Sequence, residues 1–554
     1  MRQDPLAAVS LAATPQTRPI SGTAQIKNAA GGYVFAKDQW NQVADFLILG
    51  TTGGTYYTSQ DELTTANVDV LFDAIAADGP RVVALTTEIA TARPARAPKP
   101  RPYLFALAAC AAKGDPATKQ AVKAVFPQVV RTTDHLAAFF GYWKNLAGKA
   151  SPRGTAPVIG RAMRTAFGSW FSAEDVHDVA FPALKARQRA TPAGEALALR
   201  DVIRIAHVTG RSDAHRVLIG WLAGQVSDTD ARTAVADVDD FLTAQAVATP
   251  AEAVSVIRAR RVPWEFLPST VMKDPKVWEE LIGTIGMTAL IRNLARMTRL
   301  GTLGPFTDEA TSRVVARLTN RDALAKARIH PMDVYLALKV YQAGSSQPDR
   351  RKPKQTWHPV QAISDALEVA YDMSFAAAEP TGRKYIVAVD SSGSMSGWST
   401  VVSAGSALGP AYEVANTIAV MLTRLEGSNV HVIDVDTRVH PSKVTPRTNL
   451  REIATWDSSG GGTDMSLPFT WAARQRAVVE GFVVLTDNET WAGNRHPVQA
   501  LIAYRRKFNQ AARVIVVSMT ATGYSIADPG DPGVLNVAGL DGALPKLIAG
   551  FLHS

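Results

Sequence analysis

Acidic and hydroxyl side chains gather in three short stretches of the C-terminal third of this chain. The first stretch, residues 389–394, reads VDSSGS and therefore has the spacing D-x-S-x-S. Thr463 follows a run of three glycines, and Asp487 comes just after the apolar run 482–485. Carboxylate and hydroxyl oxygens are hard donors, and a set with few carboxylates suits a divalent cation such as Mg²⁺ that keeps several waters. The chemistry that these residue types favour is therefore cation binding.

The elements around these stretches alternate between two patterns. The apolar runs 385–389, 482–485 and 514–517 read as short buried strands, and 430–433 is a fourth, interrupted only by His431. Between them lie the helical segments 411–425, 467–479 and 497–508. Strands that alternate with helices predict a doubly wound α/β domain, a parallel sheet covered on both faces. Such sheets bind ligands beyond the carboxyl ends of their strands, which is where the three stretches fall.

These three stretches, in this order, resemble the metal-ion-dependent adhesion site of von Willebrand factor A modules. The resemblance implies that a divalent cation such as Mg²⁺ is held, directly or through water, with an open position for a partner's carboxylate. A structural alternative is that the Asp and Ser side chains only cap helices at strand ends. Hydrolysis is poorly supported, because no His or Lys base adjoins the set. The implied ligands are Asp390, Ser392, Ser394, Thr463 and Asp487.

The part of the chain before this domain has a helical pattern, from about residue 37 to residue 344. Between Leu290 and Met297, for example, apolar side chains recur at i, i+1, i+4 and i+7, which is one face of a helix. Similar segments are separated by breaks rich in Gly, Pro and Asp. This pattern favours a stacked array of helical hairpins, an α-solenoid. The polar, proline-containing stretch 344–359 shows no periodicity and reads as a linker.

Length and composition limit the classes of protein to consider. A chain of 554 residues exceeds the size of a single core, so two or more domains are expected. No apolar run is long enough to span a bilayer, and the start lacks the pattern of a secretory signal. Cys110 is the only cysteine, which excludes an intrachain disulfide and a multi-cysteine zinc site. These features favour a cytoplasmic protein without membrane association.

The net charge of +9 is unevenly distributed along the chain. After residue 380 there are 15 Lys and Arg against 14 Asp and Glu, which leaves 44 against 36 in the first 380 residues. A basic excess in the helical part would favour a polyanionic partner through release of counterions. Solubility of an arginine-rich protein explains the same excess equally well.

Short motifs occur along almost the whole chain: 46–57 (FLILGTTGGTYY), 103–108 (YLFALA), 118–121 (TKQA), 160–164 (GRAMR), 288–294 (TALIRNL), 326–331 (KARIHP), 462–464 (GTD), 485–490 (LTDNET) and 525–529 (SIADP). Together they resemble the Ro autoantigen family, whose helical module is called TROVE. The resemblance runs from about residue 33 to the C-terminus and favours a bacterial member. We therefore expect a TROVE domain (31–358), a linker and lead-in (359–380) and a von Willebrand factor A-like domain (381–554), preceded by an N-terminal extension (1–30) outside the resemblance.

The family resemblance also implies a fold and a function. The helices are expected to form a ring of HEAT-like repeats, closed by the A-like domain and monomeric. Members bind Y RNA, a small noncoding RNA, on the outer surface and take single-stranded ends of misfolded RNA into the central hole. They act as scaffolds in RNA quality control rather than as enzymes. Bacterial members are linked to RNA decay through polynucleotide phosphorylase, which is therefore a candidate partner.

The basic residues of the helical part give two candidate RNA surfaces. Residues 185–189 (KARQR) resemble the family's Y RNA-binding run, and His207 resembles the histidine that follows it, at a longer spacing here. A separate stripe of arginines at i, i+4 and i+7 on one helix is a candidate for the lining of the hole. A solvated helix face is the alternative for both. The candidates are Lys185, Arg187, Arg189 and His207 in the outer cluster, Arg292, Arg296 and Arg299 in the stripe, and Arg161 and Arg164 in the motif 160–164.

Two other classes of function remain open from the residues alone. One is a metal-dependent adaptor that binds proteins through the A-like domain, with no role for RNA. The other is a metal-dependent nuclease, but that class usually needs several convergent carboxylates or two metals, which this hydroxyl-rich set does not provide. The leading interpretation is a noncoding-RNA-binding protein with a divalent-cation site.

Overall fold

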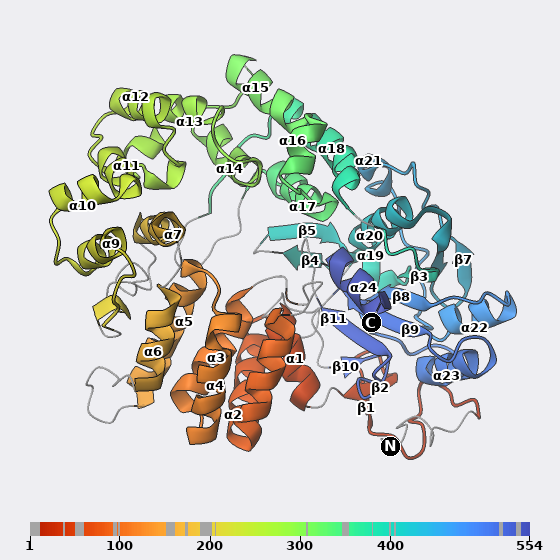
Figure 1. The fold of residues 1–554 in the computed structure, drawn as a ribbon. Helices are drawn as coiled ribbons and strands as arrows, with labels where there is room; N and C mark the ends of the chain where they lie inside the picture. Colours follow the sequence, from red (N-terminus) through yellow and green to blue (C-terminus); the bar gives the residue numbers. More distant parts are fainter. Residues whose placement is uncertain are drawn as a thin grey trace.

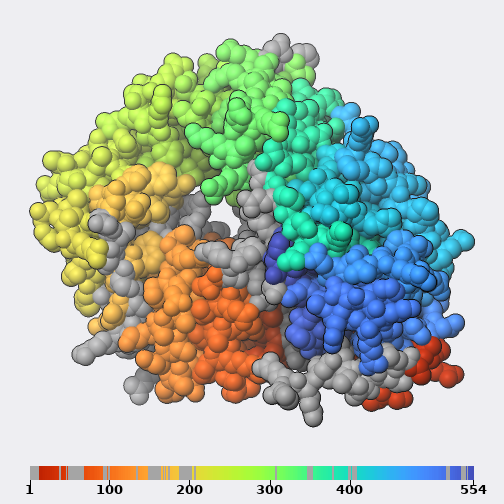
Figure 2. Space-filling model, turned by 45° about the vertical axis from the view of Figure 1, so that its right-hand side comes forward, coloured from red at the N-terminus to blue at the C-terminus, as the bar shows by residue number. Residues whose placement is uncertain are grey.

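A ring of paired helices is closed by an α/β domain in the computed structural model (Figure 1). Helix α1 (Gln39–Leu49) touches the sheet-edge strand β11 (Val534–Ala538), and α17 (Pro331–Gln342) packs against β5 (Ser406–Pro410). The space-filling view shows an opening in the middle of the ring (Figure 2). The structure describes residues 12–36, 39–49, 60–91, 97, 100–150, 161–171, 175–188, 202–204, 207–305, 308–345, 354–378, 380–397, 400–403, 406–519, 524–538 and 544–553.

The first part of the ring consists of helices that pack on one another through aliphatic and aromatic side chains. Phe126, Phe139 and Phe167 from three successive helices meet edge to face, with ring centroids 5.0–6.1 Å apart. Helix α2 is broken at Asp78, just before Pro80, where the ring of proline cannot continue the helix. The remaining helices here are α2 (Gln60–Thr91), α3 (Pro100–Lys113), α4 (Pro116–Val129), α5 (Thr133–Ala150), α6 (Arg161–Trp170) and α7 (Val176–Gln188).

The second part of the ring has shorter helices with well-defined ends. Thr249 and Glu252 form a capping box at the start of α12, and Gly224 ends α9 in the left-handed conformation. Its elements are α9 (Asp213–Ala223), α10 (Asp228–Ala234), α11 (Ala236–Gln245), α12 (Pro250–Arg260), η1 (Trp264–Phe266), η2 (Val271–Lys273), α13 (Pro275–Leu281), α14 (Met287–Arg299), α15 (Asp308–Leu318) and α16 (Arg321–Lys326).

The C-terminal domain contains a six-stranded sheet in the order β11-β9-β8-β3-β6-β7. Five strands are parallel, and the edge strand β7 runs antiparallel to β6, so the sheet is mixed rather than purely parallel. A separate hairpin, β4 (Thr400–Ser403) with β5, lies beside α17. The other strands of the sheet are β3 (Tyr385–Asp390), β6 (Val430–Val435), β7 (Val439–Pro441), β8 (Gly481–Thr486) and β9 (Arg513–Ser518).

Helices cover both faces of this sheet, as the sequence predicted. Alternate strand residues such as Val387 and Val483 belong to the core that continues into the helical ring, on the side of α20 and α24. Their neighbours Ala388 and Val484 face a second core with α22 and α23. The helices are α19 (Gly393–Gly397), α20 (Ala411–Glu426), η4 (Gly427–Asn429), α21 (Leu450–Ile453), α22 (Leu467–Arg474), α23 (Pro497–Lys507) and α24 (Leu544–His553).

The interval 359–380, interpreted as a linker and lead-in, contains a packed helix, α18 (Gln361–Ser374), followed by η3 (Phe375–Ala377). Helix α18 buries Ile363, Leu367 and Tyr371 against α15, α16 and α17. Arg451 on α21 binds Glu368 of α18 at 2.8 Å, so the helix fastens the ring to the α/β domain. Helix α18 was not predicted, because the polar, proline-containing stretch 344–359 before it favoured a linker that continued to residue 380.

The described residues near the start of the chain are part of the α/β domain rather than a separate extension. Residues 12–36, here called the N-terminal strap, lie along this domain, and their strands β1 (Gln25–Lys27) and β2 (Tyr33–Ala36) form a small antiparallel sheet with β10 (Tyr524–Ser525). Ile20 and Phe35 of the strap pack with Val498 and Ile502 of α23. Among the described residues, no helix is both long and apolar enough to cross a membrane.

Candidate metal centre and basic surfaces

The five predicted cation donors come from three neighbouring segments at one edge of the sheet. Asp390 ends β3, and Ser392 and Ser394 stand at the start of the short helix α19 that follows. Strand β8 pairs in parallel with β3, which brings Asp487 to the same edge directly after Thr486. Thr463 is buried in the loop before α22, whose backbone is bonded to Asp436 after β6 and to Ser391 after β3. The topology thus brings the three sequence stretches to one edge.

The local geometry shows how the donors are oriented. One oxygen of the fully buried Asp390 accepts the backbone N–H of Ser392 at 3.0 Å. Its other oxygen accepts the hydroxyl of Thr486 at 2.6 Å. The hydroxyl oxygens of Ser392 and Ser394 are 3.2 Å apart. Thr486 was not predicted as a site residue, although its place between strand and ligand in the run 485–490 was visible in the sequence.

Electrostatics indicate that this donor set fits a cation. Burial and repulsion from Asp487 raise the pKa of Asp390 to about 7. A bound divalent cation would stabilise two mutually repelling carboxylates that lie beside hydroxyl oxygens. Such a cation would offer an electrophilic position to an oxygen ligand, and the residues that would hold it are Asp390, Ser392, Ser394, Thr463 and Asp487.

A second group of hydrogen bonds fixes the glycine-rich loop beside the donors. The Ser459 hydroxyl donates to Asp436 Oδ2 at 2.8 Å and lies 2.8 Å from the Ser391 hydroxyl. His440 Nε2 lies 3.0 Å from the same Asp436 oxygen. Gly460 and Gly461 have positive φ values of 77° and 84°, which only glycine adopts readily. Asp436 is therefore a supporting residue that the sequence analysis did not identify.

Mg²⁺ is expected to raise the unfolding temperature of the protein more at about pH 8 than at about pH 5.5. The folded-state pKa of Asp390 lies above its unfolded value, so the folded protein holds this proton more tightly than the unfolded chain does. Without metal, the contribution of this group to stability therefore falls as the pH rises toward 7. A cation relieves that cost only where the carboxyl is ionised. Scanning calorimetry at both pH values, with and without Mg²⁺, measures the difference, and equal shifts would contradict it.

The predicted outer basic cluster is only partly described by the structure. Lys185 is half-buried on α7, where its ammonium pairs with Glu265 at 2.8 Å and lies 5.0 Å from the Phe181 ring centroid. Arg189 lies outside the described residues, as does the side chain of Arg187. His207 is exposed and has a φ of 52°, an uncommon value for a residue other than glycine. Within the predicted run 185–189, the structure therefore places only the side chain of Lys185.

Two further predicted RNA-binding arginines, Arg161 and Arg164, lie on α6. Arg164 is exposed on α6, whereas the side chain of Arg161 is not among the described ones. Arg204, which precedes His207, donates twice to the carbonyl of Ala223 at 2.9 and 3.1 Å. Arg204 therefore connects its own segment to the end of α9, and these hydrogen bonds occupy its guanidinium.

The arginine stripe on α14 divides into two kinds of residue. Arg292 and Arg299 are exposed. Arg296 instead packs with its guanidinium 4.8 Å from the Trp278 ring centroid and donates to the Met272 carbonyl at 3.2 Å. Burial lowers the pKa of Arg296, which remains charged. The prediction that all three line a hole therefore needs correction for Arg296, because helical spacing could not show that Trp278 occupies its flank.

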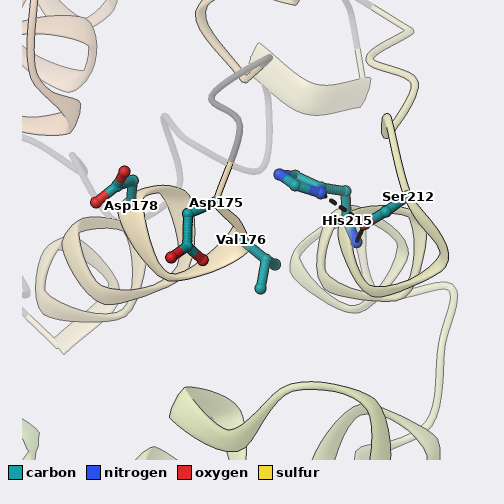
Figure 3. Close-up of a pocket in the computed structure, with 5 residues that line it drawn as sticks. All are labelled: Asp175, Val176, Asp178, Ser212 and His215. Atoms are coloured by element: carbon teal, nitrogen blue, oxygen red, sulfur yellow. Dashed lines mark hydrogen bonds between the residues drawn. The ribbon is translucent and has the colours of Figure 1, made fainter.

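A cavity of about 620 Å³ lies between the N-terminal ends of α7 and α9 (Figure 3). Asp175 just before α7 and Asp178 within it line the cavity on one side, and Ser212 and His215 line it from the start of α9. The Ser212 hydroxyl caps α9 by accepting the His215 N–H at 3.2 Å, and it lies 2.8 Å from His215 Nδ1. Two acidic residues at its wall make this cavity a poor place for a phosphate group.

A helical ring closed by an α/β domain, with five oxygen donors at one edge of its sheet, defines a two-module protein of the TROVE and von Willebrand factor A type. The sequence matches the family model for the TROVE domain over residues 258–343 and that for the Ro60 vWA domain over residues 384–552. A relative called RNA-binding protein RO60, from Deinococcus radiodurans, is 32% identical over 540 residues and 97% of each chain. The chain belongs to the RO60 family.

Two further comparisons support the family over the whole length. The RNA-binding protein RO60 of Caenorhabditis elegans is 28% identical over 597 residues, covering 95% of this chain and 90% of that one. The crystal structure of the Deinococcus radiodurans RO (RSR) protein superposes with a TM-score of 0.72 at 31% identity, covering 93% of this chain and 99% of that chain. The predicted family and two-part fold are thereby confirmed.

Proposed function

We propose that this chain binds noncoding RNA and acts as a scaffold or tether in RNA quality control, without catalysing a reaction itself. The observation that carries the proposal is the full-length similarity, in sequence and fold, to proteins named for RNA binding. The basic excess of the helical part, 44 Lys and Arg against 36 Asp and Glu, agrees with a polyanionic ligand. No feature of the described residues favours the protein-binding adaptor without RNA.

Y RNA is the proposed ligand of the outer surface, where Lys185, Arg189 and His207 would contact phosphates. Exposed basic side chains position RNA without reading its sequence. In the free protein, Lys185 already forms an ion pair with Glu265. Binding RNA would exchange this ion pair for a phosphate contact, so the net gain from Lys185 is smaller than that from an unpaired lysine.

Single-stranded ends of misfolded RNA are the proposed ligand of the central opening. Figure 1 shows α14 on the inner side of the arc of helices, and this helix carries the exposed Arg292 and Arg299. A basic channel holds single strands largely without sequence preference. The chain would act as a monomeric ring in the cytoplasm, with polynucleotide phosphorylase as a candidate partner.

Replacing Arg292 and Arg299 together by Gln is expected to weaken binding of a duplex with a single-stranded tail but to spare a blunt structured RNA. Two lost phosphate contacts should cost about tenfold in affinity at moderate salt and reduce the salt slope by roughly two. Filter binding with both ligands measures this. Arg296→Gln serves as the contrast, since loss of its contacts with Trp278 should lower the unfolding temperature instead. Equal binding of both RNAs by wild type and the double variant would refute the placement.

A divalent cation such as Mg²⁺ is proposed for the site built around Asp390 and Asp487. The cation would leave one position for a carboxylate oxygen of a partner protein, so the α/β domain would recruit proteins while the helical ring holds RNA.

Binding assays with the purified full-length protein test the proposed RNA binding directly. A structured noncoding RNA should bind with an affinity that falls steeply with salt, whereas weak binding at low salt would contradict it.

A further inference from the structure

One buried side chain of the N-terminal strap, Gln16, contacts both loops that hold predicted cation donors. Gln16 is 0% exposed, although glutamine is usually a surface residue. Its amide nitrogen donates to Asp464 Oδ1 at 2.6 Å and to the Arg495 carbonyl at 3.0 Å. Its amide oxygen accepts the hydroxyl of Thr490. The side chain is thus fully bonded to two loops, 460–465 and 487–495.

These two loops hold the predicted donors Thr463 and Asp487. The carbonyl of Thr463 lies 3.2 Å from the Thr490 hydroxyl and accepts the N–H groups of Trp491 and Ala492 at 3.1 and 2.9 Å. The Thr490 hydroxyl therefore stands between Gln16 and the backbone of a metal ligand. Displacing the Gln16 side chain would remove one hydrogen bond from loop 460–465, at Asp464 next to Thr463, and two from loop 487–495.

Close approaches of glycine show that the same contact is tightly packed. A Cβ atom on Gly32 of the strap would lie 2.0 Å from the Thr490 carbonyl oxygen. A Cβ atom on Gly462 would lie 2.6 Å from the ring of Trp491. Asn28 adds a hydrogen bond from its side-chain amide to the Thr490 carbonyl at 2.8 Å. Thr490 and Trp491 are therefore held between the strap on one side and the glycine-rich metal loop on the other.

We propose that Gln16 is a positioning residue for the cation site and that the strap and the cation bind cooperatively. This inference rests on the proposed divalent-cation site. Outer hydrogen bonds that orient ligands commonly change metal affinity by 10- to 100-fold. Because coupling between two binding events is reciprocal, a cation that is helped by the docked strap must in turn hold the strap in place. On this proposal the N-terminal strap supports the metal centre from outside its donor set.

Two substitutions of Gln16 in the full-length chain separate positioning from packing. Gln16→Ala removes all of its side-chain hydrogen bonds, and Mn²⁺ affinity measured by calorimetry should fall about tenfold. Gln16→Glu keeps the side-chain volume but sets a carboxylate against Asp464, so its loss should equal or exceed that of Gln16→Ala. A role in packing alone predicts the reverse order. Gln25→Ala is the matched control, because Gln25 bonds within the strap and to His496 without contacting the donor loops.

Hydrogen exchange in the wild-type chain tests the reciprocal effect without any substitution. Mg²⁺ should slow exchange of the strap amides of Gln16, Ala30 and Tyr33, whose N–H groups bond within this network. Metal binding with unchanged exchange, and with equal affinity in the Gln16→Ala and Gln25→Ala variants, overturns the inference and leaves the cation site standing. If the wild-type chain binds neither Mg²⁺ nor Mn²⁺, both the site and the inference fall.

Discussion

Asp390→Ala is expected to abolish binding of Mg²⁺ and Mn²⁺. Asp390 is fully buried between Ser392 and Thr486, so no exposed carboxylate can take its place. Its removal leaves Asp487 as the only acid of the predicted donor set, which is too little charge to hold a strongly hydrated cation. Calorimetry on the full-length chain measures the loss.

The same substitution should have opposite effects on stability with and without metal. Removing a buried carboxylate that is repelled by Asp487 relieves a cost in the metal-free protein, while the stabilisation that Mg²⁺ adds to wild type disappears. RNA affinity should barely change, because the basic excess lies in the helical part. Asp457→Ala, which removes an acid outside the donor set, controls for the general loss of negative charge. Unchanged Mg²⁺ affinity in the Asp390→Ala variant would refute the site.

Replacing Lys185 and Arg189 together by Ala is expected to weaken binding of structured RNA by about 2 kcal/mol and to flatten its salt dependence. Each basic side chain that contacts a phosphate releases a counterion, and two lost contacts should reduce the salt slope by roughly two. Because Glu265 pairs with Lys185 in the free protein, the single variant Lys185→Ala should contribute the smaller share. Filter binding over a series of salt concentrations measures affinity and slope together.

The control for this pair must remove the same charge elsewhere. Arg258→Ala with Arg447→Ala does so, since both arginines are exposed and lie on α12 and in the α/β domain. Its RNA affinity should stay close to that of wild type. If the Lys185/Arg189 variant behaves like this control in both affinity and slope, residues 185–189 are an ordinary solvated helix face.

The grouping of the proposed cation donors was predictable, because the order of their segments along the chain also determines where the segments lie in the sheet. Carboxyl ends of neighbouring parallel strands meet, so Asp390 and Asp487 could be brought together from strand patterns alone. The bond from Thr486 to Asp390 and the support from Asp436 depend on side-chain directions at those ends. Sequence patterns do not contain that information.

Long-range contacts explain what the sequence analysis missed. The strap looked like an extension because Gln16 and Asn28 are ordinary polar residues, and only the folded chain places them against residues more than 400 positions away. Arg296 looked like its neighbours in the stripe because periodicity assigns a face but not a partner such as Trp278. Helix α18 was assigned to a linker because of the polar stretch before it.

RNA that co-purifies with the protein from its native cell tests the proposed function most directly. The absorbance ratio at 260 and 280 nm shows whether nucleic acid is present, and sequencing identifies it. We expect a discrete small noncoding RNA together with structured RNAs that carry single-stranded 3′ ends, and we expect the Lys185/Arg189 variant to lose the first class selectively. A preparation free of nucleic acid, or one whose RNA merely mirrors total cellular abundance, would contradict the proposal.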